Sequence, residues 1–120
     1  MMYNAKAITG KYGEDIACRW LRENGFMLRE RNWRNGRYEI DVIAERYGVI
    51  HVIEVKTRQA GGMLLPEQTI TPGKAAALKR AASAYLSMYR IRCEVEFDLL
   101  AIDTLPDHTY DIRFIQEIIE

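Results

Sequence analysis

The sequence predicts a single α/β domain over residues 1–120, with a mixed sheet and one helix on each side. A length of 120 residues fits one domain. A hydrophobic fraction of 48% is too high for a disordered chain and is enough to build a core. Helix-like and strand-like segments follow one another in the order α-β-β-β-α-β-β. The simplest packing of that order places one helix on each face of the sheet.

Two segments have helical periodicity. The first begins at Thr9, a suitable N-cap, and ends at Glu23, because Asn24-Gly25 provides a left-handed stop. The second begins at Thr71-Pro72, a good N-cap and first-turn pair, and runs to about residue 89. Apolar stripes at helical spacing support both helices: Ile16, Ala17, Trp20 and Leu21 in the first, and Ala75, Leu78, Ala82, Tyr85, Leu86 and Tyr89 in the second.

Five segments are rich in β-forming residues. They cover residues 26–30, 38–45, 49–56, 93–102 and 110–118. The second and third flank Arg46-Tyr47-Gly48 and are predicted to form an antiparallel hairpin. Residues 32–37, rich in asparagine and arginine, are expected to form a loop before this hairpin.

The composition also limits the class of protein. No run approaches the roughly 20 apolar residues of a membrane span, so no membrane partner is expected. The first residues lack the hydrophobic run of a secretory signal. Cys18 and Cys93 have neither a CxxC nor a zinc-site spacing. We therefore expect two reduced, buried thiols in a cytoplasmic protein.

The net charge is zero, but the charges are distributed unevenly. Residues 1–92 carry 16 basic and 9 acidic side chains, whereas residues 93–120 carry 1 basic and 8 acidic ones. This asymmetry indicates one basic and one acidic surface. Pairing of the acidic final strands with the basic strands would explain the asymmetry equally well.

The predicted hairpin brings charged residues together. If Ile43 pairs with Val52, then Asp41 faces Glu54 and Glu39 faces Lys56 on one side of the sheet. Opposed like charges destabilise a sheet unless a positive group lies between them. A divalent ion such as Mg²⁺ would satisfy two carboxylates and keep waters that a substrate can displace.

Two further residues complete this candidate site. Lys56 could orient or acidify an attacking water, or stabilise charge on a phosphate oxygen. Glu14 falls on or beside the apolar stripe of the first helix, where a carboxylate needs a partner or a metal. The alternative for Glu54 and Lys56 taken alone is a solvated surface ion pair, worth well under about 1 kcal/mol.

These residues resemble the YraN family of small bacterial proteins, whose biochemical role is largely uncharacterised. The resemblance covers nearly the whole chain and rests on Gly10-Lys11-Tyr12-Gly13-Glu14, Asn32-Trp33-Arg34, Glu39-Ile40-Asp41-Val42-Ile43 and Glu54-Val55-Lys56-Thr57-Arg58. That family is similar to the restriction-endonuclease-like nucleases, akin to archaeal Holliday-junction resolvases. The resemblance implies an αβββαβ core with a mixed central sheet flanked by helices.

The resemblance also implies the roles of the site residues. Asp41 and Glu54 would bind Mg²⁺ or Mn²⁺, with help from the Val55 carbonyl. The catalytic set would be Glu14, Asp41, Glu54 and Lys56. One departure concerns the residue before Glu39, which is usually glycine in the family and is Tyr38 here. Tyr38 would narrow access to the site or offer a ring to a base.

Basic residues around the hairpin predict contacts with phosphate. The expected nucleic-acid-binding residues are Arg29, Arg31, Arg34, Arg37, Arg58 and Lys74. The alternative for the arginines is a solvated strand edge, with Trp33 in the core. Lys74 would contribute near the N-terminus of the second helix.

The sequence therefore predicts a metal-dependent nuclease that hydrolyses phosphodiesters in nucleic acid, with DNA favoured over RNA and branched or damaged DNA as candidate substrates. The alternative is a non-catalytic nucleic-acid-binding module in a DNA-processing assembly. Clustered carboxylates favour the nuclease, because they repel phosphate and a pure binder has no need of them. A homodimer is left open.

Overall fold

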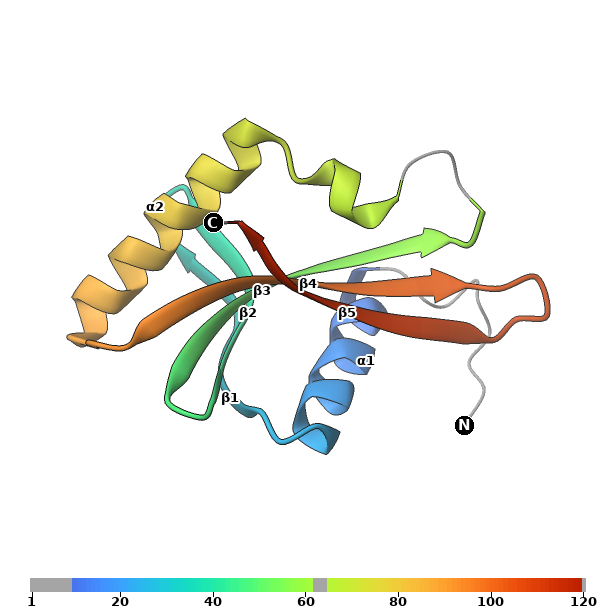
Figure 1. Ribbon diagram of the computed structural model, residues 1–120, viewed down its shortest axis with the longest axis horizontal. Coiled ribbons are helices and arrows are strands. Elements are labelled where there is room, and N and C mark those ends of the chain that lie inside the picture. The colour runs from blue at the N-terminus through green and yellow to red at the C-terminus, as the bar shows by residue number, and fades with distance from the viewer. Residues whose placement is uncertain (1–9, 62–64, 120) are drawn as a thin grey trace.

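The elements follow the predicted order in the computed structural model, which describes residues 10–61 and 65–119 (Figure 1). Thr9, the expected N-cap of the first helix, lies outside the described residues. The helices and strands are α1 (Gly10–Glu23), β1 (Met27–Asn35), β2 (Tyr38–Arg46), β3 (Val49–Gln59), the 3₁₀ helix η2 (Pro66–Thr69), α2 (Pro72–Tyr89), β4 (Glu94–Thr104) and β5 (Tyr110–Ile119).

The five strands form one sheet in the order β1-β2-β3-β4-β5. Only β3 and β4 pair in parallel, and the other neighbours are antiparallel. The connection between β3 and β4 runs through η2 and α2, as a parallel pair requires. The mixed sheet and the αβββαβ core expected of a restriction-endonuclease-like fold are confirmed, with β5 added at the edge.

The helices lie on opposite faces of this sheet, and each covers its own apolar cluster (Figure 1). On one face, Ile16, Ala17 and Leu21 of α1 pack with residues of β2, β3 and β4. On the other face, Leu78 and Tyr85 of α2 pack with residues of β1, β2 and β3. The stripes that predicted the helices are therefore the surfaces that cover the two faces.

α2 begins and ends for local reasons. The Thr71 hydroxyl accepts a hydrogen bond from the Lys74 N–H at 3.1 Å, and Pro72 occupies the first turn. At the other end Arg90 adopts a left-handed conformation with φ 53°, and its N–H caps the carbonyls of Leu86 and Ser87. The predicted helix bounds are confirmed.

Two predictions, on the loop before the hairpin and on the burial of the cysteines, are wrong. The predicted loop at residues 32–37 is mostly strand, because β1 continues to Asn35 and only a tight turn at Gly36 separates it from β2. Cys18 is buried as expected, but Cys93 is exposed, since it precedes β4. Both thiols are free. Among the described residues, no helix is long and apolar enough to cross a membrane.

Candidate active site

The candidate site lies where β2 and β3 separate. Ile43 pairs with Val52, which confirms the predicted register, and the ladder ends at Val42 and Ile53. Asp41 and Glu54 are the next residues on the two strands. The Val55 N–H donates a hydrogen bond of 2.9 Å to Asp41 Oδ2, so the Asp41 side chain reaches across the gap to β3. The separation of the strands thus places two carboxylates at the open end of the hairpin.

The predicted pairing of Glu39 with Lys56 is wrong, because β2 has already left β3 at that level. Glu39 instead forms an ion pair with Arg34 of β1 at 3.3 Å. The alternation of β2 also changes here, since Ile40 and Ile43 both pack in the cluster under α2 although they are three residues apart. On β1, the residue opposite this irregularity is Asn32, which has φ 53°.

Glu54 is buried and forms ion pairs with two lysines. Its side chain is 7% exposed, and its Oε1 lies 3.5 Å from Lys56 Nζ and 3.4 Å from Lys74 Nζ. Lys56 belongs to β3, whereas Lys74 comes from the first turn of α2. The sequence indicated Lys74 only as a phosphate contact, because nothing in the pattern shows that α2 crosses the sheet above Glu54.

The electrostatic environment of Asp41 is unfavourable to its charge. Burial, with a smaller effect from the neighbouring Glu54 carboxylate, raises the pKa of Asp41 to about 6 from 3.8. The Val55 hydrogen bond lowers this pKa, Glu14 raises it and Lys74 lowers it by smaller amounts. Among the described residues, no cation forms an ion pair with Asp41, whereas two lysines pair with Glu54.

Glu14 is brought to the same region by the close packing of α1 on β3. A Cβ atom at Gly13 would lie 2.5 Å from Thr57 Oγ1, so only glycine permits this approach. Glu14 Oε2 accepts a hydrogen bond from Asn32 Nδ2 at 2.6 Å and lies 3.7 Å from Arg31 Nε. The negative charge of Glu14 raises the pKa of Asp41. The residues that contact Glu14 directly, Asn32 and Arg31, belong to β1.

The donor set fits a hard divalent cation held by two carboxylates. Within the described part of the chain, the polar contacts of Asp41 and Glu54 are made by Oδ2 and Oε1. The second oxygen of each carboxylate is left without such a contact in that part of the chain. Glu14, Asp41 and Glu54 do not bring three ligand atoms within 4.8 Å of one another. Mg²⁺ commonly uses one or two carboxylates and retains several waters, so the pair suffices.

Most of the predicted phosphate-binding residues already contact carboxylates. Arg29 pairs with Glu45 at 3.2 Å and also donates to the Tyr85 hydroxyl. Arg31 pairs with Asp15 at 2.5 Å, and Arg34 pairs with Glu39. Lys74 pairs with Glu54, as described above. Trp33 is buried against Tyr85, as the alternative reading of that residue expected.

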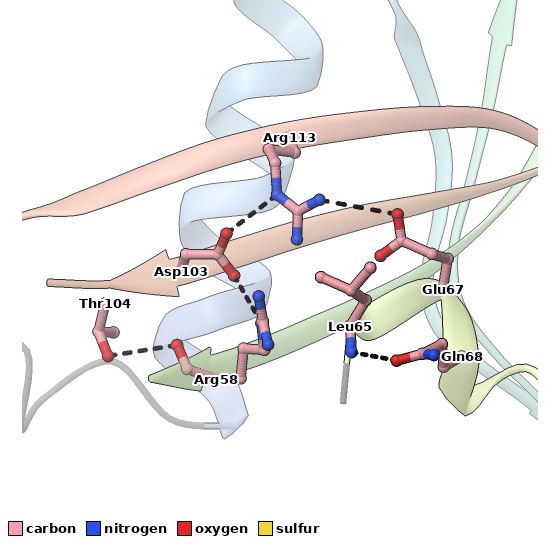
Figure 2. A network of polar contacts seen from close by, with 7 residues as sticks. All are labelled: Arg58, Leu65, Glu67, Gln68, Asp103, Thr104 and Arg113. Carbon is pink, nitrogen blue, oxygen red and sulfur yellow. Dashed lines mark hydrogen bonds and ion pairs between the residues drawn. The ribbon is translucent and has the colours of Figure 1, made fainter. Parts of the chain in front are cut away.

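Arg58 belongs to a separate network at the far end of β3, drawn in Figure 2. Asp103 of β4 accepts hydrogen bonds from Arg58 Nε at 3.0 Å and from Arg113 Nε of β5 at 2.9 Å. Arg113 also pairs with Glu67 of η2 at 3.7 Å. Asp103, from the acidic residues 93–120, thus pairs with Arg58, from the basic residues 1–92. This is the pairing that the alternative explanation of the charge asymmetry predicts.

A second polar cluster was missed by sequence reasoning. His51 is buried on the face of β3 opposite Glu54, and its ring packs edge-on against Phe26. Its Nδ1 lies 2.6 Å from Asp98 Oδ2 and 3.2 Å from Glu96 Oε2. Burial, followed by the Asp98 carboxylate, raises the pKa of Glu96. Only the parallel register of β3 and β4, which pairs His51 with Glu96, could have revealed this cluster.

Comparisons with known proteins identify relatives without a described activity. A model of the family described as "Uncharacterised protein family UPF0102" matches residues 13–102. A UPF0102 protein of Bacteroides fragilis is 36% identical over 95 residues, covering 79% of this chain and 78% of its own. One of Oleidesulfovibrio alaskensis is 41% identical over 103 residues, covering 83% and 50%.

One solved structure also resembles the chain. The crystal structure of SSO0001 is 21% identical and has a TM-score of 0.35, and the match covers 89% of this chain. The chain spans about half the length of that protein, at 50%.

Proposed function

This chain belongs to the uncharacterised protein family UPF0102, the YraN family, and for it we propose a metal-dependent nuclease that hydrolyses phosphodiesters in nucleic acid, with DNA as the favoured substrate. The observation that carries the proposal is the pair of carboxylates, Asp41 and Glu54, held at the open end of a hairpin beside two lysines. Branched or damaged DNA is the proposed substrate class.

The roles of the residues follow from their chemistry. Asp41 and Glu54 would hold Mg²⁺ or Mn²⁺, which when bound polarises a phosphate oxygen and lowers the pKa of a coordinated water. The Val55 N–H fixes the Asp41 carboxylate through its hydrogen bond. The Val55 carbonyl is a further proposed ligand.

Lys56 is proposed to assist the attacking water. Its ammonium group lies at the Glu54 carboxylate, and its side chain is 39% exposed, so it can reach a substrate phosphate or a water beside it. Glu14 is proposed to orient that water through its charge. Lys74, equally exposed, would hold the phosphate group from the α2 side.

The raised pKa of Asp41 supports this proposal. A carboxylate at this position is destabilised by burial and by Glu54, and a divalent cation would relieve both effects. Conversely, two carboxylates this close oppose the binding of a bare phosphate backbone. A module that only bound nucleic acid would gain affinity by losing them.

The decisive experiment is cleavage of a labelled panel of linear, flapped and four-way DNA substrates with Mg²⁺ or Mn²⁺. We expect cleavage by the wild-type protein and none by Glu54→Gln or Lys56→Ala. Lys79→Ala is the matched control, because Lys79 is exposed on α2 and takes no part in the site. Its rate should equal that of the wild type.

Binding is measured in parallel by gel shift without metal. Lys56→Ala should bind nearly as well as the wild type, because Lys56 is proposed to act in the transition state while other cations hold the phosphates. Glu54→Gln should bind at least as well, because it removes a negative charge that repels the backbone. If the wild type binds every substrate and cuts none, the protein is the non-catalytic binding module. Cleavage by Lys56→Ala at the wild-type rate would show that the site is assigned wrongly.

A further inference from the structure

A cavity of about 300 Å³ opens between the start of β2 and the first half of α2. Its wall is formed by Arg37, Tyr38 and Glu39 on the hairpin side, and by Lys74, Leu78 and Arg80 on the helix side. The volume is at the lower end of the range for small-molecule pockets, roughly 300–1,000 Å³. A cavity of this size accommodates one nucleotide unit.

The charges around the cavity favour an anion. Glu39, its acidic wall residue, is paired with Arg34. Within residues 10–61 and 65–119, neither Arg37 nor Arg80 forms an ion pair, although both are exposed at the wall. The guanidinium groups of Arg37 and Arg80 are therefore both available at the wall of the cavity. A guanidinium group can bind two phosphate oxygens at once.

The remaining wall suits a planar apolar group. Tyr38 is half-buried and packs against the apolar cluster under α2, and Leu78 of the same cluster lies in the wall. An aromatic ring provides a stacking surface that accepts any base. Tyr38 thus gives the cavity an aromatic wall.

The cavity also adjoins the carboxylates of the candidate active site. Lys74 lies in the cavity wall, and its Nζ is 3.4 Å from Glu54 Oε1. We infer that the cavity binds one unpaired nucleotide of a nucleic-acid strand, with its phosphate on Arg37 and Arg80 and its base against Tyr38. The placement next to the cleaved bond rests on the proposed nuclease function, whereas the binding itself does not.

The inference predicts which DNA is the better substrate. A duplex with every base stacked cannot supply a nucleotide to this cavity, whereas a flap, a bulge or a single-stranded end can do so at small cost. DNA with an unpaired nucleotide should therefore bind more tightly than a fully paired duplex of the same length and charge.

The test is calorimetric titration in EDTA with three probes: thymidine 5′-monophosphate, thymidine and inorganic phosphate. We expect the monophosphate to bind more tightly than either part. Arg37→Gln and Arg80→Gln should each weaken its binding about tenfold, the loss expected for a charged hydrogen bond. Tyr38→Leu, which keeps an apolar side chain, should weaken binding of the monophosphate and not that of phosphate.

Lys79→Gln is the matched control, because it removes one positive charge from the residue before Arg80 without touching the cavity wall. It should leave the affinity unchanged. Equal weakening by Lys79→Gln and Arg80→Gln would reduce the effect to general electrostatics and overturn the inference, as would unchanged binding in both arginine variants. Because the titration is run in EDTA, it does not depend on cleavage. Nucleotide binding in EDTA, together with no cleavage of the DNA panel in Mg²⁺ or Mn²⁺, would refute the nuclease alone.

Discussion

The Asp41 carboxylate should make the stability of the protein depend on pH. Its pKa is raised to about 6 in the folded state, against about 3.9 when unfolded. The unfolded chain therefore releases the proton first as the pH rises. The free energy of unfolding therefore falls as the pH rises from roughly 4 to 6. The stabilisation from protonated Asp41 is fully present only below the unfolded pKa.

The size of the effect follows from the shift. A difference of about two pKa units corresponds to about 3 kcal/mol at pH 8 and to under about 1 kcal/mol at pH 4. Since Asp41 is partly exposed, solvent screening reduces the value at pH 8 to about 2 kcal/mol. Asp41→Asn removes the charge and keeps an oxygen that can accept the Val55 hydrogen bond.

Urea unfolding of the wild type and Asp41→Asn at pH 4 and pH 8, in EDTA, measures this contribution. We expect the variant to gain about 2 kcal/mol relative to the wild type at pH 8, and little at pH 4. Glu23→Gln is the control, because the ion pair of Glu23 with Arg19 is exposed, so the substitution should change stability by under about 0.5 kcal/mol at both pH values. An Asp41→Asn effect that is the same at both pH values would refute the reasoning.

Three other predictions follow from the same contacts. Mg²⁺ or Mn²⁺ should bind the wild type and not Asp41→Ala in calorimetry, because Asp41 is half of the proposed ligand pair, and equal affinities would contradict the site. Affinity for DNA should fall steeply as salt rises, because Arg37, Arg80 and the half-exposed Lys74 are the proposed phosphate contacts; a flat salt dependence in gel shifts would argue against a nucleic-acid partner. Asp103→Ala should destabilise the fold by about 2 kcal/mol in urea unfolding, since it leaves Arg58 and Arg113 without their shared acceptor (Figure 2); an unchanged midpoint would show that solvent replaces that acceptor.

The sequence by itself determined the elements and the local pairing. Hydrophobic periodicity marked both helices, Thr71-Pro72 marked the start of α2, and the β2–β3 hairpin followed from its short turn. The pairing of Ile43 with Val52 followed because one face of a hairpin must be buried, and a shift by one residue would reverse the faces. Asp41 and Glu54 were therefore found as neighbours without a structure.

Only the tertiary structure decided which charges meet across elements that are distant in the chain. Lys74 reaches Glu54 because α2 packs on the face of the sheet to which Glu54 points. Asp103 accepts from both Arg58 and Arg113 because β4 lies between β3 and β5. His51 meets Asp98 and Glu96 through a parallel register that no turn connects. Such contacts depend on how whole elements dock, which periodicity does not encode. The same docking places Arg37 and Arg80 at the wall of one cavity, and among the described residues neither forms an ion pair.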